Sequence, residues 1–151
     1  MSIYLLDTNI ISYLEDSNSS FYNILIDKIG SLDDSDIVSI SVLSLYEYEY
    51  SITHADGILR EELQKTKNTI KEIFQVLPLS IEGAEIFGEL KNAYLNKTGI
   101  NKKAVNRHNV DFMLASTAII ENAVMVSNDN IFKKLTEINP ELQYENWTME
   151  E

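Results

Sequence analysis

Short apolar runs alternate along this chain with longer segments in which apolar residues recur every three or four positions. A short apolar run between polar residues is typical of a buried β-strand, whereas the longer spacing is typical of a helix that buries one face. We therefore predict strands at residues 3–6, 37–40, 76–79 and 123–126, and a last extended segment at 142–147. Helices are predicted at 10–14, 19–29, around 45–47, and at 58–74, 80–96, 109–122 and 131–135.

The order of these elements predicts the fold class. Strands that alternate with helical segments form mostly parallel sheets, and right-handed crossovers place helices on both faces of such a sheet. We expect a three-layer α/β/α fold with a mostly parallel sheet of roughly five strands, in a single domain covering residues 1–151. Pro78 places the strand at 76–79 near a sheet edge. In such sheets, ligands bind beyond the carboxyl ends of the strands.

Composition excludes several classes of protein. The chain has 151 residues, 44% of them hydrophobic, which is enough for an ordinary globular core. It has no Cys, so disulfide frameworks, thiolate zinc sites and cysteine nucleophiles are excluded. The longest apolar stretch, 112–120, is too short to span a bilayer, and the first residues do not resemble a secretory signal. We expect a soluble, cytoplasmic protein that does not enter a membrane.

Four acidic residues occupy related places in the predicted fold. Asp7 and Asp129 come after predicted strands, Glu47 lies in the helix after the second strand, and Asp111 begins the most apolar helix. In a parallel sheet all four can converge on one crevice, where their mutual repulsion favours a divalent cation with oxygen ligands. Each acid also has a structural explanation. The three aspartates suit helix N-termini, and Glu47 suits a solvated surface.

Five segments occur in order along the chain: YLLDTNIISYL, ISVLSLYEYEYSI, NVDFMLASTAI, AVMVSNDNIFKKL and a terminal ENW. Together, over nearly the whole chain, they resemble the PIN-domain ribonucleases, and most closely the VapC-type toxins of bacterial toxin–antitoxin pairs. The chain departs from the family pattern at Ser44, where Thr is frequent, and at Tyr48, where Leu is frequent. The loop between Gly99 and Asp111 is also a few residues longer than usual.

The resemblance implies a metal-dependent endoribonuclease toxin that hydrolyses RNA phosphodiester bonds, forms a homodimer and is neutralised by a cognate antitoxin. The implied cofactor is Mg²⁺ or Mn²⁺. By the same resemblance, the catalytic residues and metal ligands are Asp7, Glu47, Asp111 and Asp129. Their polar neighbours Asn9 and Ser127 would orient ligands or water. Glu49 lies two residues beyond Glu47, so the choice between these two acids depends on the register of the helix.

The charge of the whole chain argues against a nucleic-acid partner, but its distribution does not. Twelve basic residues against twenty-four acidic ones give a net charge of −12, which should repel RNA. However, residues 91–110 contain five basic side chains and no acid, and they lead directly into Asp111. We expect Lys102, Lys103 and Arg107 to contact RNA phosphates; a solvated loop is the alternative explanation.

Three further features have open interpretations. His54 and His108 are candidate general acids, although a surface or helix-end position is the favoured explanation for both. Tyr46, Tyr48 and Tyr50 suggest either a tyrosine-rich contact face for a partner or a contribution to the core. Two other functions compete with the nuclease: a non-catalytic PIN-like module that binds RNA or protein, and a Mg²⁺-dependent phosphatase-like domain. The DTN motif at Asp7 lacks the second acid of an Asp-x-Asp phosphatase motif.

Overall fold

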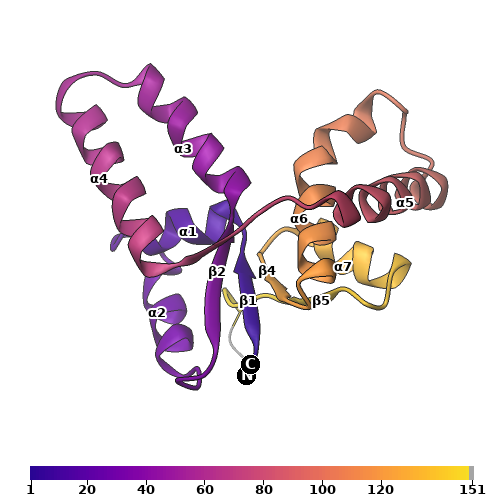
Figure 1. Cartoon of the computed structure of the whole chain (residues 1–151), viewed down its shortest axis with the longest axis horizontal. Helices are drawn as coiled ribbons and strands as arrows, with labels where there is room; N and C mark the ends of the chain where they lie inside the picture. The colour runs from indigo at the N-terminus through magenta and orange to yellow at the C-terminus, as the bar shows by residue number, and fades with distance from the viewer. Residues whose placement is uncertain (150–151) are drawn as a thin grey trace.

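The computed structural model describes residues 1–149 and shows a five-stranded parallel sheet (Figure 1). All four pairs of neighbouring strands are parallel, and the strand order is β3-β2-β1-β4-β5. The strands are β1 (Ile3–Leu6), β2 (Ile37–Ser41), β3 (Gln75–Leu77), β4 (Val124–Val126) and β5 (Gln143–Glu145). The predicted fold class is therefore confirmed, and β3, next to Pro78, does lie at a sheet edge.

Two layers of helices cover the two faces of the sheet (Figure 1). One layer contains α1 (Thr8–Glu15), α2 (Tyr22–Gly30), α3 (Val42–His54) and α4 (Gly57–Ile73). The other contains α5 (Ile81–Thr98), α6 (Asn109–Ile120) and α7 (Asn130–Ile138). The antiparallel pair of α3 and α4 stands out from the sheet as a hairpin. None of the helices within residues 1–149 combines the length and apolar character that a bilayer crossing requires.

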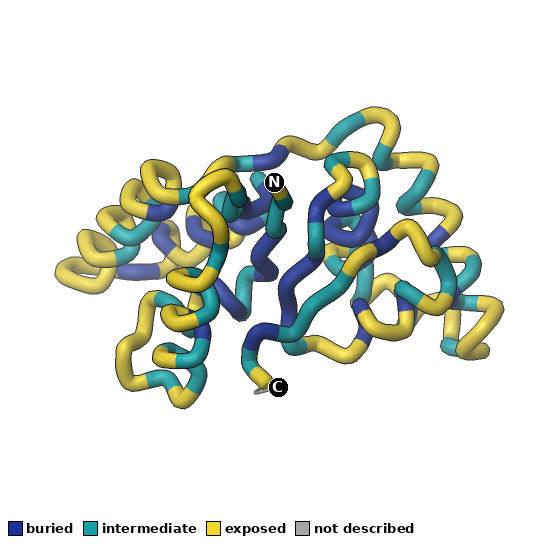
Figure 2. Tube along the Cα trace, turned by 90° about the horizontal axis from the view of Figure 1, so that it is seen from below, coloured by how far each residue is buried: buried dark blue, intermediate teal, exposed yellow. Residues whose placement is uncertain are grey.

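The central strands β1 and β4 consist of apolar and aromatic residues because both of their faces are covered by helices. Successive side chains point to opposite faces of a strand, so Leu5 packs with the α5–α7 layer and Leu6 packs with the α1–α4 layer. Met125 and Val126 on β4 divide in the same way. Figure 2 shows the buried positions running through the middle of the molecule, with exposed positions on the outer helices.

The direction in which the chain adds strands reverses at β1. The chain passes from β1 to β2 and β3 on one side, then crosses through α5 and α6 to β4 on the other side. Leu6 pairs with Val126 at the end of the two strands, so Asp7 and Ser127 leave the sheet side by side. Such a reversal opens a crevice between the strand ends, and this is where open α/β sheets bind ligands.

Two sequence-based expectations need correction. The segment between Gly99 and Asp111 is more than a loop, because it contains a 3₁₀ helix, η1 (Ala104–His108). The three tyrosines of α3 also do not share a face. Tyr48 is buried, whereas Tyr46 and Tyr50 are 69% and 68% exposed. Residues two apart on a helix point in nearly opposite directions, and residues four apart point the same way.

Candidate active site

Asp7 is a buried carboxylate at the end of β1, where it also begins α1. One of its oxygens accepts a hydrogen bond of 2.8 Å from the backbone N–H of Thr8, and the other accepts one of 2.8 Å from the hydroxyl of Ser127. Burial raises the pKa of Asp7, these two hydrogen bonds oppose that rise, and the nearby charge of Asp129 adds to it. Asp7 is thus oriented by two elements and lies within the electrostatic reach of a second acid.

The segment after β4 supplies Asp129 and a network that orients it. The backbone N–H of Asp129 donates to the Ser127 hydroxyl at 3.0 Å, and one Asp129 oxygen accepts from the N–H of Ile131 at 3.2 Å. Asn9 donates to the side-chain oxygen of Asn128 at 2.6 Å. Ser127 and Asn9 therefore tie the start of α1 to the start of α7, which holds Asp7 and Asp129 at neighbouring positions.

Asp111 lies in the first turn of α6 and contacts His108, with 3.3 Å between Asp111 Oδ2 and His108 Nδ1. Burial is the main cause that raises the pKa of Asp111 to about 6. His108 lowers it, and the charges of Asp129 and Asp7 raise it further. Asp111 therefore faces the same crevice as the two aspartates at the strand ends.

Glu47 and Glu49 lie on different sides of α3. Burial raises the pKa of Glu47, the Thr8 hydroxyl opposes this, and the charge of Asp7 adds to it. Glu49 instead pairs with Lys67 of α4 at 2.5 Å. The Ser44 hydroxyl lies 2.9 Å from that of Thr8, so Ser44 retains the hydroxyl function of the Thr that is frequent at this position. The geometry therefore turns Glu47 toward Asp7 and Glu49 toward α4.

The four acids feel one another's charge, but they are not packed together. Within residues 1–149, the only ion pair that involves any of them is His108 with Asp111, and it requires a protonated histidine. Carboxylates without a Lys or Arg partner, of which Asp7, Glu47 and Asp111 have raised pKa values, supply the oxygen donors that suit a hard divalent cation. However, no three acidic or histidine side chains in this part of the chain are gathered closely enough to surround an ion. A cation would bind partly through water, as Mg²⁺ commonly does, or draw the side chains inward.

The structure adds residues that the sequence did not indicate. Tyr144 of β5 donates to the Ser127 carbonyl at 3.0 Å, and its pKa is raised by burial first and then by Asp129 and Asp7. Asn128 links Asn9 to the Tyr13 hydroxyl. Neither residue belongs to a recognisable motif of its own. The parallel pairing of β4 with β5 is the signal that would have placed Tyr144 beside the crevice.

Two of the five basic side chains in residues 91–110 already have partners within the protein. Lys97 pairs with Glu137 of α7 at 3.0 Å, and Lys91 donates to Asn106 at 2.7 Å. Lys102, Lys103 and Arg107 are exposed around η1, and none of them forms an ion pair within residues 1–149. These are the three residues that sequence analysis selects for RNA, and η1 leads directly into α6 and Asp111.

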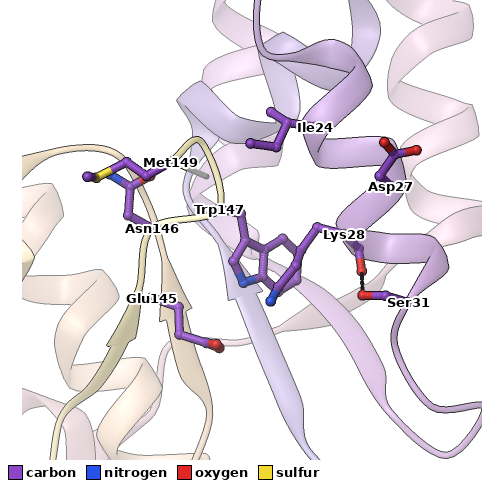
Figure 3. A pocket seen from close by; sticks show the side chains of 8 residues that line it. All are labelled: Ile24, Asp27, Lys28, Ser31, Glu145, Asn146, Trp147 and Met149. Atoms are coloured by element: carbon purple, nitrogen blue, oxygen red, sulfur yellow. Dashed lines mark hydrogen bonds between the residues drawn. The ribbon is translucent and has the colours of Figure 1, made fainter. Parts of the chain in front are cut away.

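A hollow of about 550 Å³ lies elsewhere, between α2 and the segment after β5 (Figure 3). Its lining includes Lys28, Glu145 and Trp147 and contains none of the four acids. Trp147 is 3% exposed, and its ring N–H has no acceptor within residues 1–149. Because the coupled acids Asp7, Asp111 and Asp129 lie beyond the strand ends and not in this hollow, we locate the candidate active site at the strand ends.

The chain is similar to known proteins over nearly its full length. The chain is 29% identical over 147 residues to Ribonuclease VapC2 of Rickettsia felis, a match that covers 96% of this chain and 98% of that protein. Among solved structures, VapBC2 from Rickettsia felis bound to a promoter DNA fragment gives a TM-score of 0.72 at 28% identity, covering 96% of this chain and 98% of that one. VapBC-1 from nontypeable Haemophilus influenzae gives 0.74 at 25% identity, covering 97% and 99%. The family profile of the PIN domain matches residues 4–138, and the chain therefore belongs to the PIN-domain family.

Proposed function

We propose that this protein is a metal-dependent endoribonuclease toxin, with Asp7, Glu47, Asp111 and Asp129 as its metal ligands and catalytic residues. The observation that carries the proposal is the electrostatic coupling of these acids at the reversal point of a parallel sheet, without a Lys or Arg partner in residues 1–149. The similarity to a ribonuclease over nearly the full length supports the reaction class.

Each acid has a role that its position suggests. Bound Mg²⁺ or Mn²⁺ would polarise the phosphodiester and lower the pKa of a coordinated water. Asp7, the most buried of the four, anchors the site because Thr8 and Ser127 fix both of its oxygens. Glu47 and Asp111 approach from α3 and α6, and Asp129 approaches from the start of α7. Ser127 favours the ionised form of Asp7 by donating to it, and Asn9 fixes the Asn128 segment.

Substrate RNA would approach over η1. Lys102, Lys103 and Arg107 are exposed there and adjoin the helix that carries Asp111. Positive side chains hold the phosphate backbone, while the acids hold the ion that the reaction needs. The total charge of −12 is then no obstacle, because the substrate meets the local field of this segment.

A cognate antitoxin is the second proposed partner. The similar structures named above were solved as VapBC assemblies, one of them on promoter DNA. In this chain a hollow of about 480 Å³ lies between α1, α2 and α4, and apolar side chains such as Leu14, Ile29 and Ile73 dominate its lining. An amphipathic helix seats its apolar face in a groove of this kind. We place the antitoxin there.

Purified protein, free of any partner, tests the nuclease proposal. Wild type should cleave total RNA with Mg²⁺ or Mn²⁺ and stop on addition of EDTA, whereas Asp7→Asn and Asp111→Asn should cleave at least about 100-fold more slowly. Asp27→Asn, an exposed acid on α2, is the matched control and should retain activity. Cleavage that persists in EDTA, or in both active-site variants, would falsify the proposal.

The non-catalytic PIN-like module is the second candidate. It is favoured by the absence, within residues 1–149, of three acids gathered around a common point. RNA binding without cleavage, in every metal condition and unchanged by Asp7→Asn, would establish this candidate in place of the nuclease.

A further inference from the structure

Helix α3 presents two tyrosine rings to solvent immediately beside the candidate active site. Tyr46 and Tyr50 are separated by one helical turn and are 69% and 68% exposed. Tyr48 between them is buried and donates its hydroxyl to Glu15. The Tyr50 ring also packs on His54, with ring centroids 4.3 Å apart. Tyrosine is enriched at binding surfaces because its ring buries a large apolar area, so two exposed rings one turn apart mark a candidate binding surface.

The two rings line one hollow whose lining includes one of the four acids, Glu47. This hollow has a volume of about 450 Å³ and is lined by Leu43, Tyr46, Glu47, Tyr50, Ser51 and Val110. Glu47 is therefore a wall of the hollow and at the same time faces Asp7. Val110, which is 42% exposed, directly precedes Asp111. A ligand in the hollow thus contacts Glu47 on α3 and the residue that precedes Asp111 on α6.

The chemistry of the lining favours a nucleobase over an apolar protein surface. A protein surface packed over Tyr46 and Tyr50 would also cover Glu47, and burying a carboxylate without a counter-charge is costly. When a nucleic-acid strand binds, its bases can stack on the tyrosine rings while the Glu47 carboxylate keeps a cation and water around it. Aromatic rings stack on any base, and single-stranded nucleic acid is the form in which bases are available for stacking.

We propose that Tyr46 and Tyr50 form a stacking platform for the bases next to the scissile phosphate. The proposal rests on the proposed nuclease function. Lys102, Lys103 and Arg107 hold the backbone on the α6 side of the crevice, and the tyrosines hold bases on the α3 side. Together these two sets of contacts orient the RNA strand so that it crosses the acidic crevice from α6 to α3.

The test is binding of a short single-stranded RNA in EDTA, measured by fluorescence anisotropy at fixed salt. Its comparison ligand is the same backbone with abasic positions, which keeps every phosphate and removes the bases. Tyr46→Leu and Tyr50→Leu keep apolar area but lose the ring, whereas Tyr46→Phe and Tyr50→Phe keep the ring. Each Leu variant should weaken binding of normal RNA about 10-fold, and the Phe variants should stay within about 2-fold. Affinity for the abasic strand should be the same in all of them.

Two results would overturn the proposal. One is an equal affinity of the Leu variants and wild type for normal RNA. The other is an equal loss on normal and abasic RNA together with a change from dimer to monomer in sedimentation, which would assign the hollow to a second copy of this chain. Cleavage assays in Mg²⁺ separate this proposal from the nuclease itself. RNA binding that depends on the rings, without cleavage, would support the stacking platform and contradict the nuclease. Cleavage with binding that does not depend on the rings would support the nuclease and contradict the platform.

Discussion

Asp7 illustrates how one side chain serves structure and chemistry together. Its oxygens accept from Thr8 and Ser127, so it caps α1 and is also fixed against β4. Asp129 caps α7 through one oxygen in the same way. Helix capping and metal binding therefore do not exclude each other, because a carboxylate has two oxygens with about four acceptor positions in all. The structural explanation for these aspartates, open at the level of sequence, is correct and leaves the proposed role intact.

Ser127→Ala is expected to reduce cleavage by about 10-fold or more, because the orienting partner of a metal ligand commonly contributes that much. The Ser127 hydroxyl lowers the pKa of Asp7, so its loss favours the protonated, non-binding acid. The measurement is the rate of RNA cleavage against Mg²⁺ concentration, with circular dichroism to confirm folding. Ser12→Ala removes an exposed hydroxyl from the same helix α1 and should have no effect. A Ser127→Ala enzyme with wild-type metal dependence would contradict this role.

Asp111 should make the metal-free protein less stable as the pH rises. Its folded pKa of about 6 lies above its ordinary value of 3.8, so its contribution to stability is complete below 3.8 and is lost as the pH rises through 6. In EDTA at neutral pH, Asp111→Asn should therefore be more stable than wild type, by on the order of 1 kcal/mol once partial exposure is allowed for.

Urea unfolding in EDTA at several pH values measures this difference, which should shrink toward acidic pH because both side chains are then neutral. Asp34→Asn, an exposed loop acid, serves as the control and should change the free energy of unfolding little at any pH. An Asp111→Asn variant that is no more stable than wild type at neutral pH would contradict the electrostatic account of the crevice.

At the level of elements, the register of α3 separates two neighbouring acids. Glu47→Gln should reduce cleavage at least about 100-fold, because it replaces a proposed ligand. Glu49→Gln should leave cleavage unchanged and alter the free energy of unfolding by less than about 0.5 kcal/mol, since its pair with Lys67 is largely exposed on the glutamate side. Cleavage rates of the two variants under identical Mg²⁺ decide the matter. Loss of cleavage in Glu49→Gln alone would reverse the assignment.

The hollow between α1, α2 and α4 makes a separate prediction about the antitoxin. Ile73 is 67% exposed and lines that hollow, whereas Ile58 is 74% exposed at the other end of α4 and does not. Ile73→Glu should weaken binding of the antitoxin encoded by the neighbouring gene about 10-fold or more, and Ile58→Glu should not. Calorimetry with the purified pair measures this. Equal affinities would place the antitoxin on another surface.

Element prediction succeeded where a short pattern decides the outcome. The run at residues 3–6 became β1, and Gly99 ends α5 in the left-handed region at φ 64°, where glycine carries no side-chain clash. The hydrophobic pattern did not predict η1, because so short a 3₁₀ helix shows no clear periodicity of apolar residues. The pattern also did not predict that Tyr48 is buried while Tyr46 and Tyr50 are exposed. Which side of α3 meets the core depends on where the helix begins and on the elements that pack against it.

On the scale of the whole molecule, charge distribution matters more than its sum. Replacing Lys102, Lys103 and Arg107 by Gln should weaken RNA binding and reduce the slope of log affinity against log salt by about 2, at roughly 0.7 per phosphate contact on a single strand. The same replacement at Lys133 and Lys134, exposed on α7, should change the slope little. Anisotropy titrations at several salt concentrations measure both. Equal slopes in the two variants would contradict an RNA path over η1.

The sequence by itself determined the order of strands and helices and the parallel α/β class, because these depend on local periodicity. It also supplied the four acids as a prediction, through the resemblance to a family. The tertiary structure decided which side chains meet. Ser127 contacts Asp7 only because Leu6 pairs with Val126. Glu49 pairs with Lys67 only because α3 packs on α4, and this packing turns Glu47 toward Asp7. These contacts join residues far apart along the chain, and no local pattern encodes a distance between two elements.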